Sequence, residues 1–181
     1  MCSTEYQQQV AERCVRKARM EGIHVRSAID ADADRLIEAM IDQQEYERKL
    51  HDTRLPGAQM AAVYLQHVKE SAARNNGTIW VAELDGVFAG YAACWVEHEC
   101  NVAETADSNR FGYIADTYVI PRLRGRGVVA DLLQAAESCL RASGVQRIRI
   151  GALAANASAL QAYAKHGFEA YEVVMEKRVR P

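Results

Sequence analysis

The run of residues 113–130 joins a strand pattern to a helix pattern through a turn rich in glycine and arginine. An apolar, β-branched stretch stops at Pro121, and an apolar helical period starts at Val128. Gly125 and Gly127 stand between them, and glycine lets the backbone turn and approach an anion without steric cost. Three arginines accompany the glycines: Arg122, Arg124 and Arg126. A strand, a glycine-rich turn and a helix N-terminus aim backbone N–H groups at an anion, so this run predicts a phosphate-binding turn.

Two common phosphate-binding motifs can be compared with this turn. Gly125, Gly127 and Ala130 fit the pattern G-x-G-x-x-A of dinucleotide-binding proteins. That pattern also requires an acidic residue near the end of the next strand, and residues 151–155 hold no carboxylate. The Gly-Lys-Ser/Thr of a Walker-type loop is absent as well. The sequence therefore argues against a nicotinamide, flavin or P-loop site and leaves other phosphate ligands open.

Composition and charge limit the class of protein and its partners. The chain has 181 residues, of which 49% are hydrophobic, which suits one domain with a sizeable core. A net charge of −2 argues against a non-specific nucleic-acid surface. No apolar run approaches the ~20 residues of a membrane span, and residues 1–21 lack the apolar core of a signal peptide. Because the five cysteines show no C-x-x-C spacing, we expect reduced thiols in a cytoplasmic protein, without a metal or a membrane partner.

Hydrophobic periodicity predicts the order β-α-α-β-β-β-α-β-α-β after an N-terminal helical extension at 1–21. The predicted strands are 22–29, 78–85, 87–97, 113–120, 145–153 and 168–179, and the predicted helices start at 30, 58, 128 and 156. Asp85-Gly86 between two strands is a β-hairpin signal, whereas the helix from 128 makes a crossover. The sequence thus predicts an α/β (α+β) domain over 22–181, with a mixed, mostly antiparallel sheet and helices on both faces.

Two segments of the chain resemble motifs of a known family. The run V-I-P-R-L-R-G-R-G-V-V-A-D-L-L at 119–133 is similar to the acyl-CoA-binding motif V-x-P-x-x-R-G-x-G-x-G/A of the GCN5-related N-acetyltransferases. The run N-A-S-A-L-Q-A-Y-A-K-H-G-F at 156–168 is similar to their second motif, N-x-x-A-x-x-x-Y-x-x-x-G-F. The two motifs stand in the family's order. The chain departs from the pattern at Val129, where the family has a small residue.

The resemblance implies an acetyltransferase fold with about six or seven strands and about four helices. It also implies acetyl-CoA as co-substrate, with its pyrophosphate on the turn and the helix start: Arg124, Gly125, Arg126, Gly127, Val128, Val129 and Ala130. Val119 and Ile120 are the implied main-chain partners of the pantetheine arm. Asn156 is either a helix cap, a pantetheine contact or both.

The same resemblance implies a catalytic acid. Tyr163 lies two helical turns after Asn156 and matches the family's general acid, which protonates the leaving CoA thiolate. The expected reaction is direct attack of a neutral amine on the thioester within a ternary complex. The base is left open between Asp116, on the strand before the turn, and Glu97, at the end of the preceding strand; Asp116 also has a structural interpretation.

The acceptor and the assembly are less constrained by the sequence. We expect residues 43–64 and the loop 98–112 to face the acyl group. Acidic residues in and beside that loop favour a cationic primary amine as acceptor, and they are Glu97, Glu99, Glu104 and Asp107. A solvated acidic loop is the alternative interpretation. A homodimer through 168–179 or the N-terminal helix is a further hypothesis. A non-catalytic CoA-binding sensor or interaction domain on the same fold is the alternative to the enzyme.

Overall fold

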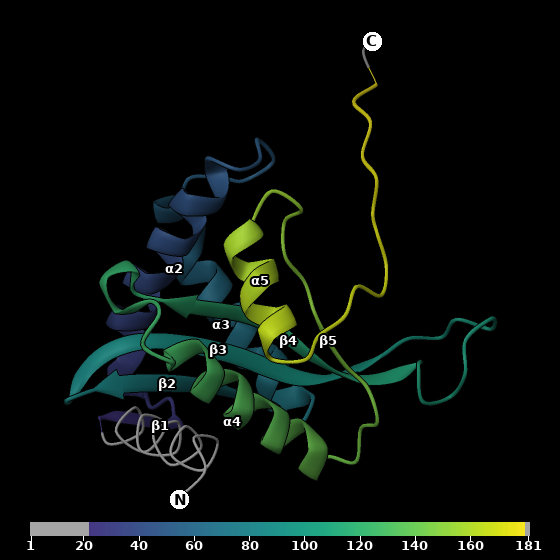
Figure 1. The fold of residues 1–181 in the computed structure, drawn as a ribbon, viewed down its shortest axis with the longest axis horizontal. Helices are drawn as coiled ribbons and strands as arrows, with labels where there is room; N and C mark the ends of the chain where they lie inside the picture. Colours follow the sequence, from purple (N-terminus) through teal and green to yellow (C-terminus); the bar gives the residue numbers. More distant parts are fainter. Residues whose placement is uncertain (1–21, 180–181) are drawn as a thin grey trace, which may run out of the picture.

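A computed structural model describes residues 22–179 as one mixed sheet with helices on both faces (Figure 1). The elements follow the chain in this order: β1 (Ile23–Ser27), a 3₁₀ turn η1 (Asp30–Asp32), α2 (Ala33–Arg48), α3 (Gly57–Arg74), β2 (Thr78–Leu84), β3 (Val87–His98), β4 (Arg110–Val119), a 3₁₀ turn η2 (Pro121–Leu123), α4 (Val128–Ala142), β5 (Ile148–Ile150) and α5 (Ala157–Lys165). The predicted extension at 1–21 lies outside the described residues. No helix within 22–179 is long and apolar enough to cross a bilayer.

The sheet has the order β1-β2-β3-β4-β5, and only β5 runs parallel to its neighbour. The hairpin between β2 and β3 turns at Asp85 and Gly86, both at positive φ, which confirms the Asp-Gly signal. The crossover from β4 to β5 passes through α4, as the sequence predicts. This sheet is the mixed, mostly antiparallel one expected from the sequence, with five strands among residues 22–179 rather than six or seven.

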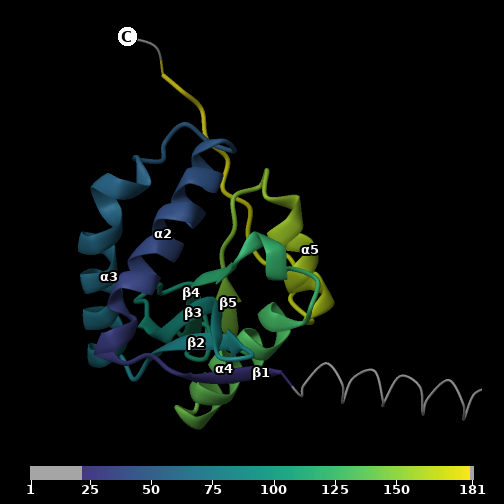
Figure 2. The ribbon, with the colours of Figure 1, turned by 90° about the vertical axis from the view of Figure 1, so that its left-hand side faces the viewer.

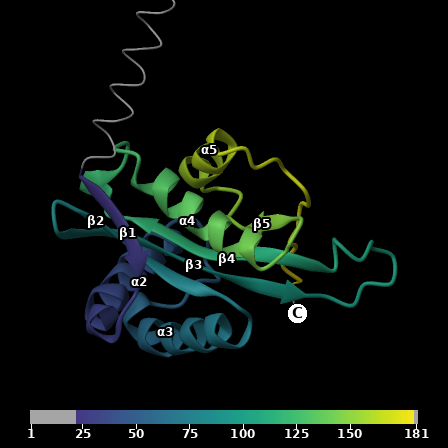
Figure 3. The same cartoon turned by 90° about the horizontal axis from the view of Figure 1, so that it is seen from below.

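Two cores hold the helices against the sheet. The α2 and α3 pair covers one face, and α4 and α5 cover the other (Figure 3). The first core joins these helices to alternate residues of the central strands: Leu36, Met40, Leu65, Val68, Val81, Tyr91, Ala93 and Trp95. The second core lies under α4: Cys94, Val96, Ile114, Leu133, Ala136 and Leu140. Because neighbours in β3 alternate between the two cores, this strand is apolar on both faces.

A bulge in β4 changes which way its side chains point. Ala93 of β3 pairs with Asp116, and the next residue, Cys94, pairs with Ile114, so Ala115 is an extra residue in the ladder. In a regular strand, residues 114 and 116 would share a face. Here Ile114 packs in the core under α4, whereas Asp116 bonds to residues of α2 and α3. The bulge therefore turns Asp116 towards the α2 and α3 side.

The strands β4 and β5 separate after the bulge. They pair only over Gly112–Ile114 and Ile148–Ile150, so the predicted strand 145–153 is much shorter than expected. The chain after β5 leaves the sheet and returns through α5, which lies apart from α2 and α3 when the molecule is turned (Figure 2). The second half of β4, which β5 does not pair with, lines an opening in the protein.

The predicted last strand, 168–179, is wrong as an element of this sheet. The segment is extended but pairs with no strand among residues 22–179, and it runs away from the body of the protein (Figure 1). The segment after residue 41, which the sequence shows only as polar, continues α2 to Arg48. That extra length brings polar side chains of α2 to the opening beside β4.

Candidate active site

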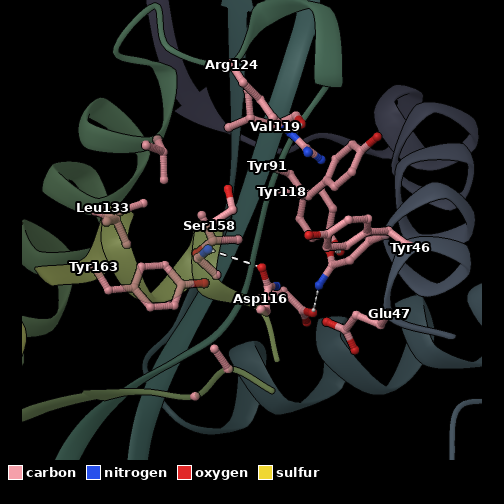
Figure 4. Close-up of a pocket in the computed structure, with 18 of the residues that line it drawn as sticks. Tyr46, Glu47, Tyr91, Asp116, Tyr118, Val119, Arg124, Leu133, Ser158 and Tyr163 are labelled. Carbon is pink, nitrogen blue, oxygen red and sulfur yellow. Dashed lines mark hydrogen bonds between the residues drawn. The ribbon is translucent and has the colours of Figure 1, made fainter. Parts of the chain in front are cut away.

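The opening beside β4 is a cavity of about 950 Å³. Its wall is shared by the second half of β4, the turn before α4, the segment after β5, α5, and the facing sides of α2 and α3 (Figure 4). Residues from both predicted motifs line it, among them Gly125, Gly127, Asn156 and Tyr163. The separation of β4 from β5 thus brings together two motifs that lie about 30 residues apart in the chain.

The turn before α4 has the backbone that the glycines permit. Gly125 and Gly127 have φ of 76° and 97°, in the left-handed region that favours glycine, and Gly127 is the N-cap residue of α4. The first N–H groups of a helix have no carbonyl four residues earlier to bond to, so the start of α4 offers donors and the positive end of its dipole to the cavity. Val128, Val129 and Ala130 line the cavity at this point.

The three arginines of the turn differ in their placement. Arg124 lines the cavity, donates from Nε to the Val119 carbonyl over 3.1 Å, and places its guanidinium 5.6 Å from the centre of the Tyr46 ring. Arg122 and Arg126 are exposed and are not part of the cavity wall. Ile120 does not line it either, and its N–H donates to the Ala89 carbonyl.

The α5 helix presents the second motif to the cavity. The Asn156 side chain accepts a hydrogen bond from the Ala159 N–H at 3.2 Å, so its capping role is present in the structure. Two turns later, Tyr163 also lines the cavity and meets Phe168 edge to face. Burial raises the pKa of Tyr163 to about 12, so its hydroxyl is protonated at neutral pH.

Asp116 also lines the cavity, within a network of neutral donors. Its Oδ1 accepts from Nε2 of Gln43 on α2 at 3.1 Å, and its Oδ2 accepts from the Tyr64 hydroxyl on α3 at 2.8 Å. The Tyr91 hydroxyl on β3 donates to Oε1 of the same Gln43. The side chain is only 8% exposed, and burial raises the pKa of its carboxyl, although the two hydrogen bonds oppose that shift.

Glu47 of α2 adds a second carboxylate to the cavity wall, near Asp116 in Figure 4. It forms an ion pair with Arg54 at 2.8 Å, and its negative charge is a further cause of the raised pKa of Asp116. Six of the chain's eight tyrosines line the same cavity: Tyr46, Tyr64, Tyr91, Tyr113, Tyr118 and Tyr163. This wall therefore combines carboxylates with aromatic rings.

Several expected contributors lie elsewhere. Glu97 is not part of the cavity wall and accepts a hydrogen bond from the Trp95 indole. No residue of the loop 98–112 lines the cavity, because that loop lies at the far end of β3 and β4 (Figure 1). Its acids bond to other groups, with Glu99 and Asp107 paired to Arg149 and Arg147, and Glu104 to Tyr171. The expectation that this loop walls the acceptor is therefore wrong, whereas residues from 43–64 do line the cavity.

The sequence analysis assigns no individual role to Gln43, Glu47, Tyr64 or Tyr91, although the first three lie within the expected wall 43–64. They belong to no motif, and Gln43 and Tyr64 lie 73 and 52 residues from Asp116. One signal in the sequence could have indicated the longer α2 helix that carries Gln43 and Glu47. Polar residues follow the apolar stripe of this helix, and no helix breaker occurs before Leu55. No cluster of three or more His, Cys, Asp or Glu residues within 22–179 has an arrangement that could hold a metal ion.

Comparison with known proteins identifies the class. The acetyltransferase (GNAT) family matches residues 36–168, so this chain belongs to that family. An uncharacterized N-acetyltransferase of Methanocaldococcus jannaschii, MJ1207, is 28% identical over 101 residues, or 56% of this chain. The match covers 43% of that relative, so it spans less than half the relative's length.

Solved structures share the fold at low identity. A transcriptional regulator from Bacillus halodurans C-125 has a TM-score of 0.66 and 16% identity, covering 87% of this chain and 99% of its own. The aminoglycoside N-acetyltransferase AAC(6')-Iy in complex with a bisubstrate analog, CoA-S-monomethyl-acetylneamine, has a TM-score of 0.63 and 18% identity, covering 88% and 99%. A predicted acetyltransferase with acetyl-CoA from Clostridium acetobutylicum has a TM-score of 0.63 and 18% identity, covering 86% and 96%. These likenesses establish the GNAT fold.

Proposed function

We propose that this protein transfers the acetyl group of acetyl-CoA to a primary amine of a small molecule or peptide. One observation carries the proposal: a single cavity joins the glycine turn at the start of α4, the Tyr163 hydroxyl and the buried Asp116 carboxyl. The glycine turn can bind a pyrophosphate, the Tyr163 hydroxyl can donate a proton, and the Asp116 carboxylate can accept one. The family and the CoA complexes of proteins with this fold support the same reaction.

Acetyl-CoA would lie along the turn and α5. The N–H groups of Val128 and Val129 at the start of α4 would hold the pyrophosphate, whereas the Ala130 N–H donates to the Gly127 carbonyl at 2.9 Å. An added Cβ at Gly125 would meet nothing within 4 Å, so this side of the turn has room for a ligand. Asn156 and Val119 line the path between the turn and the catalytic end. Arg126 and Arg122 stay at the exposed rim, where they would act on phosphate through charge.

The chemistry needs one proton removed and one supplied. The amine nitrogen attacks the thioester carbonyl, a C–N bond forms and the C–S bond breaks. Asp116 takes the proton that the amine must lose, directly or through water, and Tyr163 gives a proton to the CoA thiolate. The raised pKa of Asp116 makes its carboxylate a better proton acceptor than an exposed aspartate. Glu97, the rival base, lies outside the cavity.

The acceptor side favours a cationic amine. Asp116 is a carboxylate of that wall without a cationic partner among its hydrogen-bond donors, whereas Glu47 is paired with Arg54 of the same wall. Tyrosine rings there attract ammonium groups through their faces. These residues replace the loop acids on which the sequence-based expectation rested. Aminoglycosides, polyamines and lysine side chains all have this chemistry, and AAC(6')-Iy of the same fold is named for the first of them.

The direct test is thiol release from acetyl-CoA across a panel of these amines, with the acetylated amine identified by mass spectrometry. We expect release with a cationic primary amine in equal amount to the acetylated product. Tyr163→Phe should lower kcat by about 100-fold while the Kd for CoA stays within a few-fold, because the general acid acts after binding. Binding of acetyl-CoA without release for any amine would instead favour the non-catalytic sensor.

A matched pair of glycines tests the binding site. Gly125 and Gly144 have φ of 76° and 75°, and an added Cβ meets nothing within 4 Å at either position. Alanine at either site should therefore cost about 1 kcal/mol of stability from backbone strain alone. Only Gly125→Ala should also weaken acetyl-CoA binding, because Gly144 is not on the cavity wall. Equal Kd values for the two variants would remove the turn from the site.

A further inference from the structure

Thr117 of β4 brings a buried hydroxyl group to the cavity wall. Its Oγ1 makes no hydrogen bond of ordinary geometry with any of residues 22–179. A buried hydroxyl without such a bond costs free energy, so each one in a folded protein calls for an explanation. Trp80 Nε1 is the other buried side-chain atom of this kind in the described part of the chain, but Trp80 is not on the cavity wall. Thr117 therefore places an unsatisfied polar group at the candidate active site.

The alternation of β4 after its bulge sets the direction of the Thr117 side chain. Asp116 bonds to residues of α2 and α3, and Tyr118 packs in the core on that same side. Val119 packs instead against residues of α4. Successive side chains of a strand point to opposite faces, so Thr117 shares the face of Val119. The Thr117 hydroxyl thus points to the side of the sheet that α4 and α5 cover.

Tyr163 of α5 lies on this side and lines the same cavity, into which its hydroxyl points (Figure 4). Its ring is held by Phe168, with the two ring centres 6.2 Å apart and an angle of 65° between the planes. Burial raises the pKa of Tyr163, and the Thr117 side chain opposes this rise. A hydroxyl has that effect when it donates towards the phenol oxygen, so the two hydroxyls are neighbours.

The geometry of the two hydroxyls falls short of a formed hydrogen bond. Hydrogen bonds between catalytic groups are often long in the free enzyme and shorten in the reacting complex. We propose that Thr117 is a positioning residue, which turns the Tyr163 hydroxyl towards the CoA thiolate and donates to its oxygen as the proton leaves. This role rests on the proposed function, in which Tyr163 is the general acid.

The proton transfer explains why a second hydroxyl is useful at this point. The O–H bond of Tyr163 breaks, an S–H bond forms on CoA, and a phenolate remains until it takes a proton from water. A negative oxygen in a largely buried site is unstable unless a donor faces it. The Thr117 hydroxyl can supply that donor, because its one hydrogen is not used by any of residues 22–179.

Single-turnover acetyl transfer by the full-length protein tests this role, since it measures the chemical step. The acceptor is spermidine, kanamycin or lysine, whichever reacts fastest with the wild type. Thr117→Val should lower the rate by about tenfold, the scale of one hydrogen bond to a charged oxygen, with little change in KM for acetyl-CoA or the amine. Thr117→Ser keeps the hydroxyl and should stay within about threefold of the wild type. In a Tyr163→Phe background, Thr117→Val should cause no further loss, because no phenolate forms there.

Thr78→Val is the matched control, because it removes a threonine hydroxyl that lies away from the cavity wall. Thr78 Oγ1 donates to the Gly77 carbonyl at 2.8 Å. This variant should melt at a lower temperature and react at the wild-type rate. Thr117→Val should melt at or above the wild-type temperature, since it replaces an unsatisfied buried hydroxyl by a methyl group of similar size. The two variants therefore separate loss of stability from loss of rate.

The outcomes distinguish this inference from the proposed function. A wild-type rate in Thr117→Val overturns the inference alone, provided that Tyr163→Phe is slow. An equal loss from Thr117→Val with and without Tyr163 also overturns it, because Thr117 would then act on acetyl-CoA or the amine directly. A Tyr163→Phe variant as fast as the wild type overturns both the general acid and the inference. No transfer by the wild type to any of the three amines overturns the inference together with the proposed function.

Discussion

The two buried aspartates of this protein, Asp32 and Asp116, differ in what surrounds them. Asp32 is 3% exposed and accepts two hydrogen bonds from the Arg26 guanidinium, at 2.7 and 2.9 Å, and one from the Ile29 N–H. These bonds lower its pKa to about 2. Asp116 is 8% exposed and accepts only from an amide and a phenol, and burial raises its pKa.

The difference shows how one residue type serves two purposes in one fold. A buried carboxylate that faces a cation is held in its charged form and holds its neighbours in place. A buried carboxylate with only neutral donors is less stable when charged, so it takes a proton more readily. Asp32 belongs to η1 and bonds to Arg26 of β1, which also pairs with Glu83 of β2, and it is not part of the cavity wall. Asp116 does form part of that wall. We therefore infer that Asp32 stabilises the fold and that Asp116 accepts a proton in the reaction.

The largest effect should come from Asp116→Asn. Removing the proton acceptor should lower kcat/KM for the amine by about 100-fold or more at pH 7, the usual contribution of a general base. Asparagine keeps the shape of the side chain, so the melting temperature and the Kd for acetyl-CoA should change little. A rate within a few-fold of the wild type would remove Asp116 as the base and point to Glu47 or to water.

The matched substitution Asp32→Asn should have the opposite profile. The fall of the Asp32 pKa from 3.8 to about 2 corresponds to about 2 kcal/mol of stability at pH 7. Because the folded pKa is depressed, this contribution is present above pH 4 and is lost as the pH falls towards 2. Urea unfolding of the variant should therefore show a loss of about 2 kcal/mol at pH 7 that shrinks in acid. An unchanged stability at pH 7 would contradict the role of the Arg26 pair.

The smallest effect should come from Tyr64→Phe, which removes one donor from Asp116. That hydrogen bond lowers the pKa of Asp116, so its loss should raise the pKa further. The acid limb of the kcat/KM profile should then move to higher pH, with a several-fold lower rate below that limb and little change above it. Tyr118→Phe is a suitable control, since its hydroxyl contacts Asp42 and not Asp116. A uniform fall at all pH values would indicate lost packing instead.

Features fixed by neighbouring residues could be predicted from the sequence. The glycine turn, the Asp-Gly hairpin and the Asn156 cap depend on backbone angles and caps set within a few residues. The alternation at 169–179 predicts an extended backbone, and the segment is extended. The alternation does not show whether the same chain supplies a partner strand, because the spacing of apolar side chains depends only on the local backbone. The last strand was therefore assigned to a sheet that it does not join.

Features that depend on distant packing could not be predicted. The bulge at Ala115 turns Asp116 towards α2 and α3, and no local pattern of apolar residues shows it. Gln43 and Tyr64 reach Asp116 only because two helices pack on that face of the sheet. In the sequence Glu97 is a rival to Asp116 because it ends the strand that precedes the strand of Asp116, and only the fold places one of the two carboxylates in the cavity.

The most direct test of this account is a ¹³C NMR titration of protein labelled at the aspartate carboxyls. Asp32→Asn and Asp116→Asn identify the two signals by their disappearance. We expect Asp32 to titrate near pH 2 and Asp116 to titrate above the ordinary aspartate value of about 3.9. An Asp116 carboxyl that titrates at or below the ordinary value would contradict its role as the proton acceptor.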